Sequence, residues 1–333
     1  HGPWAAIYGG KAAYIGGCQN TSNIVTGVEV GFPSSGTMAH SYVTSFGPTV
    51  KGEYEAFDKY IKTHKNEVLI LLVDTYDTLK CGIKNAIKAF KANGIDDSYP
   101  CGYGIRLDSG DLTYLSIKAR DMLDEAGLKN CKIFATNALD EYLIMELERQ
   151  GCKVDSYGVG DAIATSKHNP CFGNVYKLVQ VDDMPVLKRS EESSKLINPG
   201  FQITYRIIRN NKFKIDVTCL RGDKLAQAIE NHEEITLRDE NDRLKSTTFP
   251  AGSYEYRILQ PQVMKDGKPI VEYVSIQEKR NYYLTNLAHL DDTEKRLINP
   301  HYYKCDISDD LYDLKERLIE NIVKEIEEFD KEG

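Results

Sequence analysis

The sequence predicts an α/β protein built on a mainly parallel sheet, followed by a smaller β-rich section and a helical C-terminal segment. Short runs of Val, Ile and Leu recur at intervals of roughly 25 to 30 residues, and each is followed by an amphipathic segment. Polar, glycine-containing turns follow each predicted strand. This pattern is typical of a barrel or a doubly wound sheet with its site at the carboxyl ends of the strands.

The first βα unit is the clearest. Residues 67–74 (EVLILLVD) form the predicted strand, and apolar residues at helical spacing predict a helix over about 77–93 that Gly94 ends. Further strands are expected at 102–107, 131–135 and 154–159, with helices at 112–126 and 139–150. All candidate motifs described below lie at the carboxyl edge of these strands.

After about residue 182 the pattern changes. Residues 202–209 and 212–220 alternate between apolar and polar positions and are joined by Asn210-Asn211, which predicts a hairpin. Beyond residue 273 the chain turns helical and ends in an amphipathic segment, 311–330, with one apolar stripe. We therefore expect three parts: a barrel core with the active site (1–182), a β-rich section (183–272) and a helical segment (273–333).

Composition excludes several classes of protein. The 333 residues include 42 basic and 50 acidic side chains, mixed along the chain without a basic run, which argues against nucleic-acid binding. The eight cysteines form no Cys-x-x-Cys pair and are expected to be reduced thiols. Without a membrane span or signal peptide, a soluble cytoplasmic protein is expected. The chain starts at His1 in mid-element, so we expect it to be the remainder of a longer protein.

The segment Asp108-Ser109-Gly110-Asp111-Leu112 joins a predicted strand to a predicted helix. Ser109 or Asp111 can cap that helix while its free N–H groups face an anionic ligand; alternatively, Asp111 is only an N-cap. Arg106 precedes Asp108 by two residues, so both side chains project to the same side of the strand. The pair can be purely structural, or Arg106 can bind a planar carboxylate through two hydrogen bonds.

Two further features are open to a chemical and a structural interpretation. Gly158 and Gly160 lie in a turn where the backbone can approach a phosphate closely, but they can also serve only a tight bend. His40 follows the small-residue loop Ser34-Ser35-Gly36-Thr37 and opens a predicted helix over 40–46. A histidine there can exchange protons or attack phosphorus, and a structural role is the alternative.

Taken together, these segments resemble the nicotinate phosphoribosyltransferase family across nearly the whole chain. The matching motifs are Ala12-Ala13-Tyr14-Ile15-Gly16-Gly17, Thr21-Ser22-Asn23, Gly36-Thr37-Met38-Ala39-His40-Ser41, Asp74-Thr75-Tyr76-Asp77-Thr78, Arg106 through Leu112, Leu139-Asp140-Glu141-Tyr142, Tyr157-Gly158-Val159-Gly160, Thr165-Ser166-Lys167, Val175-Tyr176-Lys177-Leu178, Asn198-Pro199-Gly200 and Asn299-Pro300-His301. The number of motifs in one order makes the resemblance specific.

The resemblance implies a type II phosphoribosyltransferase fold, which is an incomplete parallel α/β barrel joined to a smaller β-rich domain, usually as a homodimer. The implied reaction transfers a phosphoribosyl group from phosphoribosyl pyrophosphate to nicotinate. It releases pyrophosphate and forms nicotinate mononucleotide for NAD biosynthesis. ATP hydrolysis is coupled to the transfer through a phosphohistidine, and the motif match places that histidine at His40.

By the same match, His40 and Asp108 are the expected catalytic residues, with Asp108 beside the ribose or the reacting carbon. Thr37 and Arg106 are expected to hold nicotinate, and the turn at Gly160-Asp161 to hold the phosphoribosyl group. The full set of expected substrate-binding residues is Ser35, Gly36, Thr37, Arg106, Ser109, Gly110, Asn137, Gly158, Gly160 and Asp161. Mg²⁺ is expected to accompany the pyrophosphate, and no side chain is assigned as a metal ligand.

The chain departs from the family pattern in three places. Many members carry Gly-Asp where this chain has Asn137-Ala138, and Thr where it has Asp161. Because an acid beside a phosphate is unfavourable, we expect main-chain N–H groups to make that contact while the Asp161 side chain points away. The family's N-terminal region, the implied source of a ring-stacking aromatic residue and an arginine, is absent. A separate N-terminal polypeptide would then complete the site, or the fragment would be inactive alone.

Two other functions remain open. A relative that uses nicotinamide would be expected to offer an acid to the amide, but the loop at 19–23 has none, which favours nicotinate; quinolinate is disfavoured only by the motif match. From a different class, the chain can be a non-catalytic scaffold or binding remnant of this fold. That alternative predicts tight binding without turnover.

Overall fold

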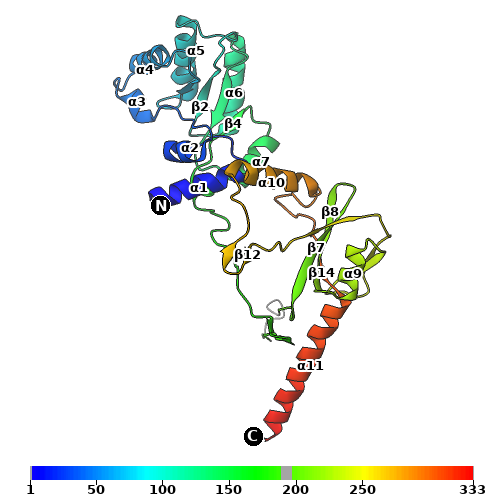
Figure 1. Cartoon of the computed structure of the whole chain (residues 1–333). Coiled ribbons are helices and arrows are strands. Elements are labelled where there is room, and N and C mark those ends of the chain that lie inside the picture. The colour runs from blue at the N-terminus through cyan, green and yellow to red at the C-terminus, as the bar shows by residue number, and fades with distance from the viewer. Residues whose placement is uncertain (1, 189–196, 333) are drawn as a thin grey trace. The chain divides into compact units, whose positions relative to one another are not determined.

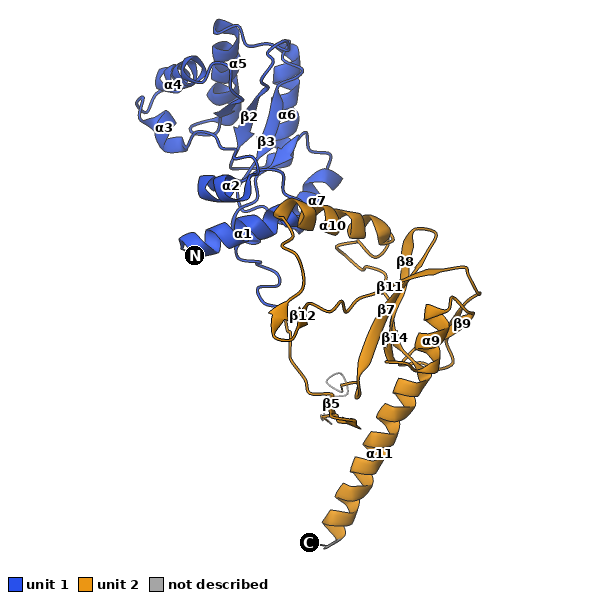
Figure 2. Cartoon of the chain, viewed as in Figure 1, with its two compact units in different colours: residues 1–172 blue, residues 173–333 orange. Residues whose placement is uncertain are grey.

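The computed structural model describes residues 2–188 and 197–332, which form two compact units, 1–172 and 173–333 (Figures 1 and 2). The starting residue His1 and residues 189–196 of the expected β-rich section lie outside the described residues. The expected division into three parts at 182 and 272 stays a prediction. Each unit is described by itself.

Unit 1 alternates helices and strands in the predicted order. Its elements are α1 (Pro3–Ile15), α2 (Ile24–Val30), α3 (His40–Thr44), α4 (Val50–Thr63), β1 (Leu69–Leu72), the π-helix η1 (Thr78–Gly82), α5 (Ile83–Ala92), β2 (Tyr103–Leu107), α6 (Leu112–Glu125), β3 (Lys132–Ala135), α7 (Glu141–Arg149), β4 (Ser156–Tyr157) and α8 (Asp161–Ala164). All four predicted strands are present, and β4 is shorter than expected.

The sheet of unit 1 is parallel and follows the order β1-β2-β3-β4. A doubly wound sheet reverses its strand order at a switch point, whereas a barrel adds each strand beside the previous one. The sequential order therefore favours the barrel over the doubly wound alternative. It also brings the turns after β1, β2, β3 and β4 to one edge of the sheet.

The core of unit 1 lies between this sheet and its helices. All four residues of β1 are buried, as expected for a strand covered on both faces. Large buried side chains of the core include Phe57 from α4, Phe90 from α5 and Leu123 from α6. This packing holds the carboxyl ends of the strands in fixed positions.

The helix expected over 77–93 is one continuous segment that starts as the π-helix η1 and continues as α5. Asp77 caps its start by accepting a hydrogen bond from the Lys80 N–H. Gly82 is the last residue of η1, and a Cβ there would lie 1.8 Å from the main-chain oxygen of Val73. This close approach ties the helix to the end of β1, where the first candidate site residues lie.

Unit 2 is built mainly from antiparallel strands and ends in a long helix. Its elements are β5 (Gln180–Val181), β6 (Met184–Pro185), β7 (Gln202–Arg209), β8 (Lys212–Leu220), α9 (Lys224–Glu230), β9 (Ile235–Arg238), β10 (Ser246–Phe249), β11 (Glu255–Ile258), β12 (Met264–Lys265), β13 (Lys268–Pro269), α10 (Ile276–His289), β14 (Cys305–Ile307) and α11 (Asp309–Glu332). The central sheet has the order β11-β7-β8-β14.

The β7–β8 hairpin confirms the sequence prediction residue by residue. Asn210 and Asn211 have φ angles of 53° and 57°, which a two-residue hairpin turn of the favoured type requires and Asn tolerates. The alternating apolar side chains of both strands face one core, with Tyr205 fully buried.

Helix α11 starts in the core of unit 2 and leaves it (Figure 1). Leu311 is 0% exposed and Leu314 is 9% exposed, whereas Ile326 on the same apolar stripe is 52% exposed. The predicted packing surface is therefore buried only in the first turns of α11. Within 2–188 and 197–332, no helix combines the length and apolar character needed to cross a bilayer.

Candidate active site

His40 lies at the start of α3 and faces the carboxyl ends of β1 and β2. Its Nδ1 is 3.1 Å from the hydroxyl oxygen of Thr75. Its Nε2 is 3.7 Å from Oδ1 of Asp74 and 3.7 Å from Oδ2 of Asp108. Both distances exceed a hydrogen bond but keep the imidazole within strong electrostatic reach of two carboxylates. The His40 side chain is 42% exposed, so a ligand can reach it.

Asp74 is the most buried carboxylate of this site, with a side chain only 1% exposed. Its Oδ2 accepts hydrogen bonds from the Asp108 N–H at 2.9 Å and from the Ser109 hydroxyl at 2.6 Å. Its Oδ1 is buried without a hydrogen-bond partner. Asp74 was not among the predicted site residues, although an acid at the end of an apolar strand was a signal for it.

Arg106 on β2 and Asp108 in the following turn form the predicted pair, with 3.0 Å between Nη2 and Oδ1. Burial raises the pKa of the Asp108 carboxyl. Hydrogen bonds from Thr136 and Arg106, together with the charges of Arg106 and His40, outweigh that effect and lower its pKa below the ordinary value. Asp108 is therefore ionised at neutral pH.

Thr136, the residue after β3, connects the two members of this pair. Its hydroxyl oxygen accepts a hydrogen bond from Nε of Arg106 at 2.9 Å, and the hydroxyl donates to Oδ1 of Asp108. The sequence analysis did not single out Thr136. A threonine at a strand end carries no distinctive signal until the pairing of β2 with β3 is known.

The turn after β2 contains the predicted helix cap. Asp111 caps α6 by accepting a hydrogen bond from the Tyr114 N–H at 2.9 Å, so its role in the fold is the structural one. Ser109 bonds to Asp74 and does not cap the helix. Gly110 has a φ of +79°, a conformation that L side chains rarely adopt.

Thr37, Ser35, Gly36 and Asn137 lie on loops outside this hydrogen-bond network. The Thr37 hydroxyl donates to the main-chain oxygen of Ile70 at 2.9 Å, and the Ser35 N–H donates to Thr21 at 2.8 Å. Gly36 is exposed. Asn137 has a φ of 90° and Ala138 a φ of 49°, so the turn after β3 has the backbone shape that glycine favours.

Gly158 and Gly160 follow β4, and Asp161 begins α8 with an exposed side chain. The structure thus joins His40, Arg106, Asp108 and Ser109 in one contact network. Ser35, Gly36, Asn137, Gly160 and Asp161 lie on neighbouring turns.

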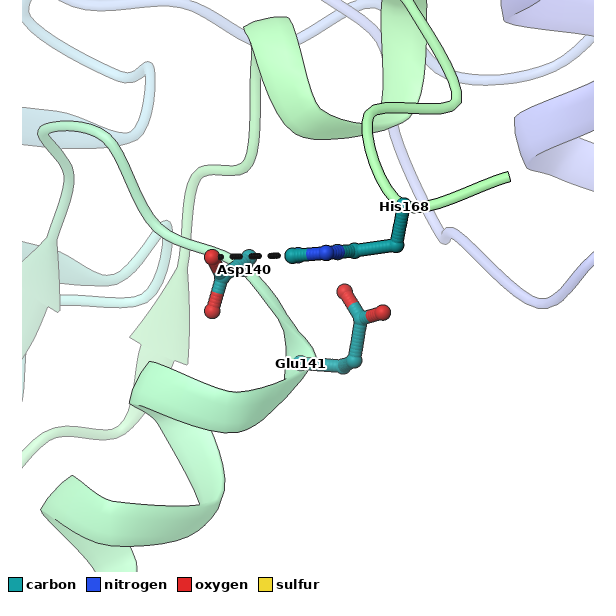
Figure 3. Close-up of side chains that lie close together, drawn as sticks. All are labelled: Asp140, Glu141 and His168. Carbon is teal, nitrogen blue, oxygen red and sulfur yellow. Dashed lines mark hydrogen bonds and ion pairs between the residues drawn. The ribbon is translucent and has the colours of Figure 1, made fainter. Parts of the chain in front are cut away.

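A second group of titratable side chains lies at the start of α7. The carboxylates of Asp140 and Glu141 and the imidazole of His168 come within 4.8 Å of one another (Figure 3). However, one oxygen of Asp140 caps α7 through the Leu143 N–H, and the other lies 3.5 Å from the ammonium group of Lys167 and 3.3 Å from His168. Because both oxygens of Asp140 already have partners within the chain, one of them the Lys167 ammonium group, we assign no metal to this group.

The family assignment follows from comparison with known proteins. The model of the nicotinate phosphoribosyltransferase C-terminal domain matches residues 201–315. A nicotinate phosphoribosyltransferase of Bacillus subtilis (strain 168) is 37% identical over 97% of this chain. This chain belongs to the nicotinate phosphoribosyltransferase family. It spans 64% of the length of the Bacillus subtilis relative.

Solved structures support the fold of this nicotinate phosphoribosyltransferase family member. The human nicotinic acid phosphoribosyltransferase superposes with a TM-score of 0.72 at 23% identity, covering 96% of this chain and 68% of the human one. A nicotinate-nucleotide pyrophosphorylase from Pyrococcus furiosus gives a TM-score of 0.57 at 24% identity, covering 87% of this chain and 63% of its own. The predicted type II phosphoribosyltransferase fold, with an incomplete parallel barrel, is confirmed.

Proposed function

We propose that this chain carries the active site of a nicotinate phosphoribosyltransferase. It transfers a phosphoribosyl group from phosphoribosyl pyrophosphate to nicotinate, forming nicotinate mononucleotide and pyrophosphate in NAD biosynthesis, and couples the transfer to ATP through a phosphohistidine. The observation that carries the proposal is the position of His40, whose Nε2 lies 3.7 Å from each of two carboxylates beside an arginine.

The surroundings of His40 suit a phosphoryl carrier. One ring nitrogen must be unprotonated to attack the terminal phosphorus of ATP, and the bond to the ADP oxygen then breaks. The carboxylates of Asp74 and Asp108 lie nearest Nε2, which is proposed to keep the proton. Nδ1, 3.1 Å from the Thr75 hydroxyl, would exchange that contact for the attack on phosphorus. Water later attacks the phosphohistidine and releases phosphate, so that the imidazole is restored.

Arg106 is proposed to bind the carboxylate of nicotinate. A guanidinium has five N–H donors, and Arg106 uses three of them on Thr136, Asp108 and, at a long 3.5 Å, the main-chain oxygen of Met38. Two donors remain for a substrate carboxylate, in the planar arrangement that such a group prefers. Thr37 already donates its hydroxyl hydrogen to Ile70, so its proposed contact with nicotinate is through the main chain.

Asp108 is proposed to stabilise the glycosyl transfer. As the bond between the ribose carbon and the pyrophosphate oxygen breaks, positive charge develops on the ribose ring before the nicotinate nitrogen bonds to that carbon. A fixed negative charge near this carbon lowers the barrier. The lowered pKa of Asp108 keeps that charge available at neutral pH.

The turns after β2, β3 and β4 are proposed to hold the phosphates through main-chain N–H groups. Ser109 and Gly110 precede α6, a helix of 14 residues whose start favours anions. A Cβ built at Gly160 would meet no atom within 4 Å, so space is open above this turn. Asn137 and Asp161 border the same edge, with the Asp161 side chain directed away from the phosphate.

Mg²⁺ is proposed to enter with phosphoribosyl pyrophosphate, bound mainly by the pyrophosphate oxygens. The carboxylates of Asp74 and Asp108 at this edge are hard oxygen donors of the kind that Mg²⁺ prefers. The ion would supply the positive charge that stabilises the leaving pyrophosphate. A homodimer is part of the proposal, and the molar mass of the protein in solution tests it.

Product formation from each pyridine base tests the proposal. The protein is incubated with phosphoribosyl pyrophosphate, ATP and Mg²⁺, and with nicotinate, nicotinamide or quinolinate in turn. We expect nicotinate mononucleotide from nicotinate, formed faster with ATP than without it. Faster turnover of nicotinamide or quinolinate would overturn the substrate assignment, and tight binding without turnover of any base would support the scaffold alternative.

A further inference from the structure

The hydroxyl group of Thr136 is the shared hydrogen-bond partner of Arg106 and Asp108. Pairing of β2 with β3 brings these residues together, because the Thr136 N–H donates to the main-chain oxygen of Leu107 at 2.9 Å. The hydroxyl oxygen accepts from Nε of Arg106, and its hydrogen goes to Oδ1 of Asp108. One rotamer of one side chain therefore fixes both the arginine and the acid.

The methyl group of Thr136 lies against Gly158, in the turn after β4. A Cβ built on Gly158 would come within 2.6 Å of Cγ2 of Thr136, which is much closer than real Cβ contacts. The next nearest neighbours, Cβ of Thr136 and the main-chain oxygen of Ala135, are 3.8 and 3.9 Å away. Among the residues that the structure describes, the Thr136 methyl is thus the only close obstacle to a side chain at Gly158.

We propose that Gly158 is a positioning residue, whose missing side chain leaves room for the Thr136 methyl group and so holds the Thr136 hydroxyl between Arg106 and Asp108. This inference deepens the proposed function and rests on it, because it gives the network a role in binding nicotinate. Gly158 and Gly160 differ in this respect, since a Cβ on Gly160 would meet no described atom within 4 Å.

The coupling follows from the geometry of threonine. The methyl and hydroxyl groups share one Cβ, so any χ1 rotation that moves Cγ2 away from position 158 also moves Oγ1. With alanine at 158, the threonine must rotate or β4 must shift away from β3. Rotation removes the hydrogen bonds to both Arg106 and Asp108 and frees the guanidinium to adopt other orientations.

A double substitution tests the coupling. Thr136→Ser keeps the hydroxyl and removes the methyl, so Gly158→Ala should be tolerated in its presence. The four proteins (wild type, both single variants and the double variant) are compared by melting temperature and by equilibrium titration with nicotinate. Thr136→Val, which keeps the shape and removes the hydroxyl, is the fifth, and Gly160→Ala serves as a steric control for the melting temperature.

We expect Gly158→Ala to lower the melting temperature and to weaken nicotinate binding by about tenfold or more, the effect of losing roughly 1.4 kcal/mol. Thr136→Ser should remain near the wild type, and the double variant should recover both properties. Thr136→Val should weaken nicotinate binding with little change in melting temperature. Gly160→Ala should leave the melting temperature unchanged.

A double variant as impaired as Gly158→Ala alone would overturn the inference, because the defect would then not pass through the Thr136 methyl. A second outcome is that the double variant recovers its melting temperature while every variant, including Thr136→Val, binds nicotinate as the wild type does. That result supports the steric contact between position 158 and the Thr136 methyl. The nicotinate role of the network, and with it that part of the proposed function, is then overturned. The two failures are therefore distinguishable.

Discussion

Nε2 of His40 lies 3.7 Å from Oδ1 of Asp74, a buried carboxylate oxygen that has no hydrogen-bond partner. A buried, unpaired acceptor is costly, and small movements of the imidazole would bring the two atoms into hydrogen-bond distance. This relationship links the end of β1 to the residue proposed to carry the phosphoryl group.

Asp74→Asn tests that link. The amide keeps an acceptor for the Asp108 N–H and the Ser109 hydroxyl but removes the negative charge beside His40. We expect the rate of His40 phosphorylation by ATP to fall on the order of 100-fold, as is typical when a proton-holding partner is lost. Asp77→Asn, which alters the cap of η1 in the same loop, is the control and should phosphorylate at close to the wild-type rate. Equal rates in wild type and Asp74→Asn would refute the link.

Arg106→Lys separates charge from geometry at the nicotinate site. Lysine keeps the positive charge but cannot offer the planar pair of donors, so nicotinate affinity should fall by about 10- to 100-fold. The affinity for phosphoribosyl pyrophosphate should be largely kept, as titrations with each ligand would reveal. Arg149→Lys, an exposed arginine on α7, is the matched control. Equal losses for both ligands would contradict the assignment of Arg106 to the carboxylate.

Burial of Glu53 on α4, outside the site, should make the stability of unit 1 depend on pH. Its side chain is fully buried, with one oxygen bonded to Asn85 and the other unpartnered. Burial raises the pKa of Glu53, and the hydrogen bond from Asn85 only partly offsets this effect. The folded pKa therefore exceeds the unfolded one. The contribution of Glu53 to the free energy of unfolding is fully present below the pKa that Glu53 has in the unfolded chain. It is lost as the pH rises through the pKa of Glu53 in the folded chain.

Glu53→Gln should consequently raise the melting temperature at pH 8 by about 2–4 °C, the shift produced by roughly 1 kcal/mol in a unit of this size. Near pH 4, where Glu53 of the folded wild type is protonated, the difference should shrink. Glu55→Gln, at an exposed position of the same helix, should change little at either pH. A variant less stable than wild type at pH 8 would contradict this explanation.

Two substitutions on the apolar stripe of α11 should differ sharply in their effect on the free energy of unfolding. Leu311→Ala removes a fully buried side chain and should lower the free energy of unfolding of unit 2 by about 2–5 kcal/mol. Ile326→Ala, at a 52% exposed position, should change it by only about 0.5 kcal/mol or less. Denaturant titration measures both. A large loss for Ile326→Ala would mean that the end of α11 is covered in solution.

Much of the fold was predictable because βα periodicity is a local signal. The strands at 102–107 and 131–135 and the hairpin at 202–220 were expected within one residue of their observed bounds. The π-helical start of the helix after β1 was not predictable. Its last residue, Gly82, lies against the main-chain oxygen of Val73, a contact that forms only in the folded chain.

The candidate site also contains residues that were predictable from the sequence and residues that were not. His40 and the Arg106–Asp108 pair were predictable, because their positions follow from a turn and from the alternation of side chains along a strand. Thr136 and Asp74 were missed as members of the network. Their contacts depend on how β1, β2 and β3 pair, so an acid or a threonine at a strand end does not by itself show which side chains it will bind.

Labelling of His40 tests the central claim most directly. The protein is incubated with Mg²⁺ and ATP labelled on its terminal phosphate, and the label is examined for acid lability and position. We predict acid-labile label on His40 that is absent from His40→Ala and is released faster when phosphoribosyl pyrophosphate and nicotinate are added. Label that persists in His40→Ala, or no label in a wild-type protein that forms nicotinate mononucleotide faster with ATP, would contradict the account.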